Sequence, residues 1–256
     1  MKLTKRNYFS QKANQHYMSV SQFKAFDKCP FAALAEINGE YEREKTTALL
    51  VGSYVDSYFE GELDKFKEEN PEIFKRDGTL KAEYVQAEAI IERIKKDKLF
   101  MHYMSGLKQV IMTGEIEGVP VKIKIDSLLP DRIVDLKIVA NFEPIYDEEK
   151  GRLPWFEYWG YDLQGAVYQE IVRQNTGKVL PFYLAAATKE KVTDIDIVHL
   201  PPKQLEFAME HFKYNVPTFD AMKKGVIELD RCEKCAWCKE TKILTEPTEA
   251  DEFYLL

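Results

Sequence analysis

A short stretch in the middle of the chain, IKIDSLLPDRIVDLKIV at residues 123–139, constrains the fold more than any other. Its second half, VDLKI, alternates apolar residues with Asp135 and Lys137. This period of two predicts a β-strand that buries one face and carries the acid and the lysine on the other. The preceding Leu-Pro-Asp-Arg is typical of a turn. The stretch is therefore predicted to be a β-hairpin.

Asp126 is the acid on the first strand of this hairpin. With the loop centred on Pro130 and Asp131, Asp126 lies opposite Asp135. Directly opposed residues have Cβ atoms roughly 5 Å apart, and like charges there destabilise a sheet. A divalent ion takes oxygen ligands and removes the repulsion. The pattern favours a metal site, and the alternative is a surface hairpin with solvated charges.

These residues, together with two further motifs, resemble a known family. Asp126 with Asp135-x-Lys137 is similar to the PD-(D/E)xK nuclease motif, in the RecB-like branch. MSVSQFKAFDKCPFAALAEINGEY near the N-terminus resembles the start of phage RecE-like (exonuclease VIII-type) nuclease domains. Gln164 and Tyr168 match the Gln-x-x-x-Tyr motif that follows the catalytic hairpin in these enzymes. The resemblance covers roughly residues 18 to 242.

The resemblance implies an α/β fold with a restriction-endonuclease-like core, in which helices flank a mixed central β-sheet. It also implies a single nuclease domain over residues 1–256. Residues 1–108 would form a helical part, and 109–200 the core sheet with the Gln-x-x-x-Tyr helix. Residues 201–256 would supply a C-terminal helix and a cysteine cluster.

The family pattern assigns a role to each motif residue. Asp126, Asp135 and the carbonyl of Leu136 would bind Mg²⁺ or Mn²⁺. Lys137 would position or deprotonate the attacking water. Gln164 and Tyr168 share one helix face and would orient the lysine and the DNA backbone. The alternative for this pair is an ordinary buried glutamine and a core tyrosine.

Asp56 is a departure from the family pattern. RecB-like nucleases usually have a histidine one turn after a helical glycine, whereas Gly52-Ser-Tyr-Val-Asp56 has an aspartate there. An oxygen ligand suits Mg²⁺ or Mn²⁺ at least as well as an imidazole. We expect Asp56 to be a metal ligand, with a helix-surface charge as the alternative. Ile138 is a second departure, because the family commonly has threonine after the lysine.

The four cysteines form a second constellation: Cys29, then Cys232, Cys235 and Cys238. This spacing resembles the ligation of a [4Fe–4S] cluster in bacterial ferredoxins. It also resembles the iron staple of AddB-type and CRISPR-associated RecB-like nucleases, whose last gap is generally longer. A Cys₄ zinc site would use the same ligands, and unligated thiols are the third alternative.

Composition sets limits on the location and partners of the protein. The chain is 45% hydrophobic, enough for a sizeable core, and no run approaches the ~18 apolar residues of a membrane span. The N-terminus lacks the apolar segment of a signal peptide. We therefore expect a cytoplasmic protein, and the resemblance implies a phage or prophage gene in a bacterial host. The net charge of −7 argues weakly against a nonspecific nucleic-acid coat but not against one basic channel.

The predicted function is a metal-dependent deoxyribonuclease, most concretely an exonuclease that exposes single strands of linear double-stranded DNA for recombination. The resemblance further implies a homo-oligomer and, as a partner, a single-strand annealing protein. Two other classes stay open. One is an endonuclease or single-strand nuclease, and the other is a non-catalytic DNA-binding protein on the same fold.

Periodicity and turn signals predict the remaining elements. A helix capped by Ser19 or Ser21 is expected, and its apolar residues recur at helical spacing as far as Leu34. Residues 140–158 are expected to form a loop. Further helices are expected at 46–59, 81–96, around Gln164 and at 202–214. Strands are expected at 109–115, 121–127, 132–139, 179–187 and 194–199.

Overall fold

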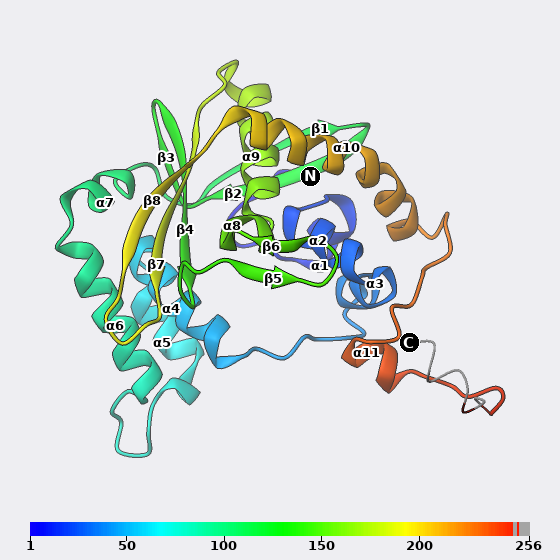
Figure 1. The fold of residues 1–256 in the computed structure, drawn as a ribbon, viewed down its shortest axis with the longest axis horizontal. Helices are drawn as coiled ribbons and strands as arrows, with labels where there is room; N and C mark the ends of the chain where they lie inside the picture. Colours follow the sequence, from blue (N-terminus) through cyan, green and yellow to red (C-terminus); the bar gives the residue numbers. More distant parts are fainter. Residues whose placement is uncertain (248–249, 251–256) are drawn as a thin grey trace.

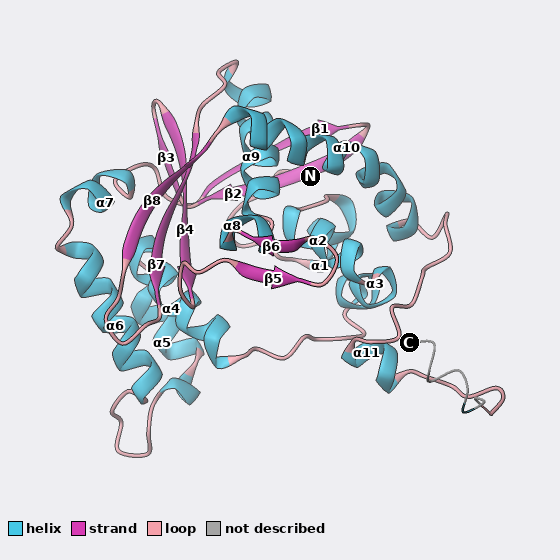
Figure 2. Cartoon of the chain, viewed as in Figure 1, coloured by secondary structure: helices cyan, strands magenta, loops and turns pink. Residues whose placement is uncertain are grey.

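The computed structural model describes residues 1–247 and 250, so the end of the predicted 201–256 part lies outside the described residues. Helices and strands alternate in blocks along the chain (Figure 2). The α-helices are α1 Gln11–His16, α2 Val20–Lys28, α3 Pro30–Asn38, α4 Thr47–Glu60, α5 Leu63–Glu69, α6 Ala82–Lys95, α7 Lys98–Tyr103, α8 Trp155–Tyr158, α9 Tyr161–Thr176, α10 Pro202–Lys223 and α11 Ala236–Glu240, with a 3₁₀ turn at Pro71–Ile73. The strands are β1 Val110–Ile116, β2 Val119–Ile125, β3 Ser127–Leu129, β4 Arg132–Val139, β5 Ile145–Asp147, β6 Gly151–Leu153, β7 Phe182–Thr188 and β8 Ile195–Leu200.

Four strands form the central sheet, in the order β3-β4-β7-β8 (Figure 1). β4 and β7 run parallel, whereas β3 with β4 and β7 with β8 are antiparallel. The pairs β1–β2 and β5–β6 form separate antiparallel hairpins. The sheet is thus mixed and has helices on both faces, which confirms the predicted fold class.

The sheet separates two hydrophobic cores. Leu184 and Ala186 of β7 lie in the core that includes α2, α9 and α10. Their neighbours Ala185 and Ala187 lie in the core that includes α4 and α6. Successive residues of a strand point to opposite faces, so each strand of this sheet contributes to both cores.

The predicted first strand of the hairpin, residues 121–127, is two strands. β2 ends at Ile125 and pairs with β1, and β3 begins at Ser127 and pairs with β4. The chain bends at Asp126, between the two sheets. The register of the hairpin is nevertheless the predicted one, because Ser127 pairs with Val134 and Leu129 with Arg132.

The helix predicted to run on to Leu34 is also two helices. Ser19 caps α2 through a capping box with Gln22. Cys29 ends α2 in an extended conformation, and Pro30 begins α3. Proline disfavours helical geometry at the residue before it and fits the first turn of a new helix. The proline therefore explains the break.

Two further segments differ from prediction. Residues 140–158 contain the β5–β6 hairpin and the short α8 rather than a continuous loop. α10 runs to Lys223, well past the predicted end at 214, and contains Pro217. Proline is a stop signal in isolation, but Val216 and Phe219 are buried on the core face and hold the helix together. Within the described residues, none of the helices has both the length and the apolar character needed to cross a membrane.

Candidate active site

Asp135 and Lys137 lie on β4 in the middle of the sheet. Their neighbours Val134 and Leu136 are buried in the core of α4 and α6, so the acid and the lysine face the α9 side. Asp135 is 2% exposed, and its Oδ2 forms an ion pair with the Lys137 ammonium. Burial raises the pKa of Asp135 to about 7, although the Lys137 charge opposes the shift. For Lys137, burial lowers the pKa, but the charges of Asp135 and Asp126 outweigh it and raise the value overall.

Asp126 stands at the bend between β2 and β3, one residue beyond the hairpin ladder. Its Oδ2 accepts a hydrogen bond from the backbone N–H of Leu136 at 3.0 Å. Its Oδ1 accepts one from the side-chain amide of Gln109 at 3.2 Å. The carboxylate takes the place of a ladder carbonyl, which corrects the expectation that Asp126 is itself a strand residue facing Asp135.

Asp56 reaches the same region from α4. Thr46 caps this helix with its hydroxyl, and the buried Val51 and Val55 fix the helix face that packs on the sheet. Burial raises the pKa of Asp56 well above its ordinary value, and the charge of Asp126 raises it further. Asp56 also lines a cavity of about 340 Å³. The helix therefore brings a third carboxylate to the charges on β4.

Gln164 and Tyr168 come from α9, on the opposite side of the acids from α4. Gln164 donates a 2.6 Å hydrogen bond from Nε2 to Oδ1 of Asp135. Tyr168 donates from its hydroxyl to the carbonyl oxygen of Lys124, at 3.0 Å. α9 lies close to β7 because Gly165 faces the Phe182 ring without a side chain of its own. The pair thus has two targets: Gln164 holds the acid, and Tyr168 anchors β2.

The predicted role of Leu136 involves its backbone. Its side chain is 4% exposed and packs in the core of α4 and α6. Its N–H is used by Asp126. The assignment of its carbonyl as a metal ligand stays a prediction.

Sequence reasoning missed several residues around this site. Gln109 has a positive φ of 54° and directs its amide at Asp126. Lys24 of α2 donates to the carbonyl of Trp159 at 2.8 Å, and its Nζ lies 5.2 Å from the centre of the Tyr161 ring. Lys137 also lies over that ring, with its Nζ 4.8 Å from the ring centre. These contacts join segments that are far apart in sequence, so no local sequence pattern predicts them.

Glu60 and Lys124 form a second missed pair, at 3.9 Å. Both line the cavity beside Asp56. Here a sequence signal existed. Glu60 is four residues after Asp56 on the same helix face, and Lys124 is two residues before Asp126.

The acids fit a divalent cation. Asp135 Oδ2 is buried and has no partner other than Lys137 among residues 1–247. The negative charge of Asp126 repels the other two carboxylates and raises the pKa of both Asp135 and Asp56. A hard cation with oxygen ligands would relieve that repulsion. The oxygen atoms of the three carboxylates lie farther apart than the sulfur atoms of the four cysteines. In the described part of the chain, the cysteines are the group whose ligand atoms all lie within 4.8 Å of one another.

The cysteines lie apart from this site. Cys29 is between α2 and α3, and the other three precede or lie in α11. Their sulfur atoms all lie within 4.8 Å of one another. The structure therefore brings together the four residues that the spacing singled out.

Comparisons with known proteins agree with this architecture. The sequence profile of a family described as "PDDEXK-like domain of unknown function (DUF3799)" matches residues 19–241. A search of curated proteins finds no match. A crystal structure of a protein named "Putative exonuclease" from Eubacterium rectale is 51% identical, covers 99% of this chain and 98% of that chain, and superposes with a TM-score of 0.96. The predicted PD-(D/E)xK resemblance is confirmed, and the chain belongs to this family of PDDEXK-like domains.

Proposed function

We propose that the chain is a metal-dependent deoxyribonuclease, acting as one nuclease domain. The observation that carries the proposal is the arrangement on β4. A buried Asp135 is ion-paired to Lys137, held by Gln164, and flanked by Asp126 at the adjoining bend. A buried carboxylate with a perturbed pKa that shares a strand face with a lysine is typical of a catalytic site.

Each residue has a distinct role in this proposal. Asp126 and Asp135 would hold Mg²⁺ or Mn²⁺, with Asp56 and the Leu136 carbonyl as further ligands. The cation supplies Lewis-acid chemistry for phosphodiester hydrolysis when bound. Lys137 would orient the attacking water and offset negative charge that develops on the phosphoryl oxygens. Gln164 fixes the position of Asp135, and Tyr168 fixes the backbone of β2 beside Asp126.

The preferred substrate is linear double-stranded DNA entered from an end, as the RecE-like resemblance implies. The name of the similar Eubacterium rectale protein supports exonuclease action. An exonuclease of this kind would expose single strands for recombination in a bacterial cytoplasm, for a phage or prophage. A single-strand annealing protein and further copies of the chain are the proposed partners. The four cysteines would hold a structural metal, either iron–sulfur or zinc.

The deciding experiment is a time course of digestion with Mg²⁺ on three substrates. These are end-labelled linear duplex, covalently closed duplex without nicks, and end-labelled single-stranded DNA. We expect loss of the linear duplex from its ends and an intact closed circle. Cleavage of the circle at the same rate would select an endonuclease, and cleavage of single strands alone a single-strand nuclease. Binding without hydrolysis would select the non-catalytic alternative.

Variants link the activity to the site. Asp126→Ala, Asp135→Ala and Lys137→Ala should each lower the rate by at least roughly a hundredfold, with circular dichroism showing a retained fold. Asp196→Asn, which alters an exposed carboxylate on β8, is the matched control and should keep the wild-type rate. Full activity in Lys137→Ala, or hydrolysis without a divalent ion, would refute the mechanism.

A further inference from the structure

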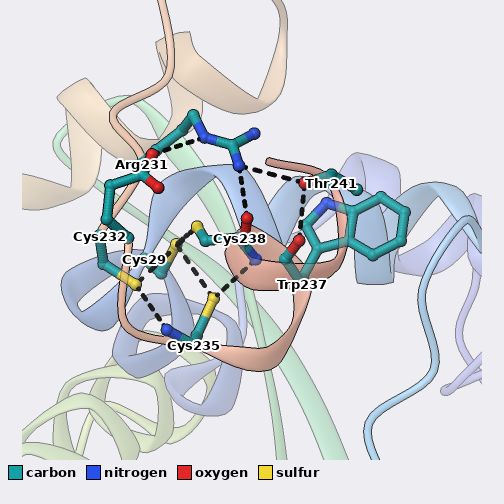
Figure 3. Close-up of polar contacts among 8 residues, drawn as sticks. Cys29, Arg231, Cys232, Cys235, Trp237, Cys238 and Thr241 are labelled. Atoms are coloured by element: carbon teal, nitrogen blue, oxygen red, sulfur yellow. Dashed lines mark hydrogen bonds and ion pairs between the residues drawn. The ribbon is translucent and has the colours of Figure 1, made fainter. Parts of the chain in front are cut away.

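The four cysteines form a compact site (Figure 3), which contains none of the residues of the proposed active site. They are all the cysteines of the chain, and each has a free thiol. Cys29 lies 3.6 Å from Cys238 and 3.8 Å from Cys235, measured between sulfur atoms. Cys232 lies 4.0 Å from Cys238. Four sulfurs at such distances, with no disulfide among them, make a ligand set for a metal.

Local structure fixes the position of each sulfur. Cys29 is held by the Pro30 break between α2 and α3. The backbone N–H of Cys235 donates to the sulfur of Cys232 at 3.3 Å, and the N–H of Cys238 donates to the sulfur of Cys235 at 3.4 Å. Both bonds come from Cys-x-x-Cys turns, in which the peptide N–H groups point at the sulfurs.

The sulfur distances discriminate between the two metals that the sequence left open. A tetrahedral zinc with Zn–S bonds of about 2.3 Å places its sulfur ligands about 3.8 Å apart. Three of the six sulfur pairs lie 3.6, 3.8 and 4.0 Å apart, around this value, and all six lie within 4.8 Å. In a [4Fe–4S] cluster each cysteine binds a different iron of the cube, so its sulfurs must stand considerably farther apart. The iron–sulfur expectation does not fit this arrangement.

We infer that Cys29, Cys232, Cys235 and Cys238 bind one Zn²⁺ ion, which fastens α3 to the segment that carries α11. Structural zinc sites are four-coordinate with all positions filled by protein, as here. The inference does not depend on the proposed nuclease activity, because no residue is shared between the two sites.

The surroundings suit a zinc–thiolate centre. Four thiolates around Zn²⁺ leave a net negative charge, and the Arg231 guanidinium lies beside it, donating to the Cys238 carbonyl at 2.7 Å. The same guanidinium lies 4.4 Å from the centre of the Phe31 ring. Phe31 also stacks on Trp237, with ring centres 6.2 Å apart. A cation and two aromatic rings thus cover a centre whose Cys29 and Cys238 are buried.

The zinc would have a specific mechanical role. α11 lies beside α3, as Figure 1 shows, although about 200 residues separate them in sequence. Besides the cysteine sulfurs, a backbone hydrogen bond joins the two segments: the Phe31 N–H donates to the carbonyl oxygen of Asp230 at 3.3 Å. Among residues 1–247, the hydrophobic cluster around the cysteines is smaller than the two cores that pack on the central sheet. Loss of the ion should therefore free residues around 226–241 and leave the two larger cores intact.

Metal analysis of the full-length protein tests the inference. The protein is expressed in medium that contains both iron and zinc, and it is purified once in air and once without oxygen. We expect one zinc per chain, no iron and no visible absorbance from both preparations. A brown anaerobic preparation with about four irons per chain would overturn the inference, and so would folded protein with neither metal.

Variants and cobalt give readouts that do not rely on activity. Cys235→Ser should lose the zinc and expose residues 226–241 to limited proteolysis. Thr241→Val removes a neighbour of Arg231 but no ligand, so this control should retain one zinc. Because Cys235→Ser could also misfold, the wild-type apoprotein is titrated with Co²⁺ alone. We expect the intense absorption of tetrahedral cobalt–thiolate at one equivalent, and a spectrum without it would refute four-sulfur coordination.

Discussion

Two glycines in helices beside the proposed site should respond oppositely to alanine. At Gly165 of α9, an added Cβ would lie 2.6 Å from Cδ1 of Phe182 and 3.0 Å from a methyl of Leu205. Phe182 is fully buried on β7, so its ring cannot move aside cheaply. Overpacking of this kind costs typically ~1–3 kcal/mol, whereas alanine in a helix gains about 1 kcal/mol over glycine. The net loss is therefore up to about 2 kcal/mol, and Gly165→Ala should have a lower unfolding free energy than the wild type.

Gly52 of α4 is the matched control, because an added Cβ there meets no atom within 4 Å. Only the higher helix propensity of alanine remains, so Gly52→Ala should raise the unfolding free energy by up to about 1 kcal/mol. For a chain of this size, 1 kcal/mol shifts the melting temperature by roughly 2–4 °C. Thermal melts followed by circular dichroism should therefore show Gly165→Ala below and Gly52→Ala above the wild type. A Gly165→Ala protein as stable as wild type would refute the close packing of α9 on β7.

Two further predictions concern other contacts. Gln164→Ala removes a hydrogen bond to the Asp135 carboxylate worth ~1.5–3 kcal/mol, so the Mg²⁺ concentration for half-maximal hydrolysis should rise roughly tenfold to a hundredfold; an unchanged Mg²⁺ titration would contradict this role. Burial lowers the pKa of Lys122 from 10.5 to about 8 while its Nζ donates to the Tyr8 carbonyl and the Asn14 side chain. Between these two pKa values the unfolded chain binds more protons, so the penalty of burying the charge is present below pH 8 and disappears as the pH rises to 10.5. The stability of the wild type relative to Lys122→Met should therefore increase by roughly 1–3 kcal/mol across that window, and urea unfolding at both ends that shows no such change would contradict the buried charge.

Predictions from local pattern succeeded where one strand or helix determines the outcome. The alternation around Asp135 and Lys137 is a property of β4 alone, and β4 has the predicted bounds. The hairpin register followed from the turn for the same reason. Gln164 and Tyr168 share a helix that the pattern located correctly.

Predictions failed where distant segments decide the geometry. The bend at Asp126 arises because β2 pairs with β1 while β3 pairs with β4, a choice between two sheets that one hairpin pattern does not contain. Gln109 and Lys24 reach the site because distant segments of the chain pack together, and no local sequence pattern predicts that packing. The break at Pro30 was visible in the sequence, and the apolar period on either side of it masked the signal.

The three carboxylates allow one more prediction, on Asp56. The charges of Asp126 and Asp135 raise the pKa of Asp56, and the charge of Asp126 also raises the pKa of Asp135, so the site is unfavourable without a cation. Asp56→Asn should therefore make the metal-free protein slightly more stable and reduce the stabilisation that Mg²⁺ confers. A ligand stabilises by RT ln(1 + [L]/Kd), so a tenfold weaker Kd removes about 1.4 kcal/mol at saturating Mg²⁺.

Melting temperatures with and without Mg²⁺ measure both effects in one experiment. Asp64→Asn, which removes an exposed acid from the neighbouring α5, controls for net charge and should keep the wild-type response. Asp56→His restores the residue type usual in RecB-like nucleases, and we expect it to keep part of the response and to favour Mn²⁺ over Mg²⁺. A helix-surface charge with no metal contact would behave differently: Asp56→Asn would then shift the melting temperature by the same amount with and without Mg²⁺. That result would remove Asp56 from the ligand set and leave Asp126 and Asp135, which suffice for Mg²⁺ because this ion keeps several waters.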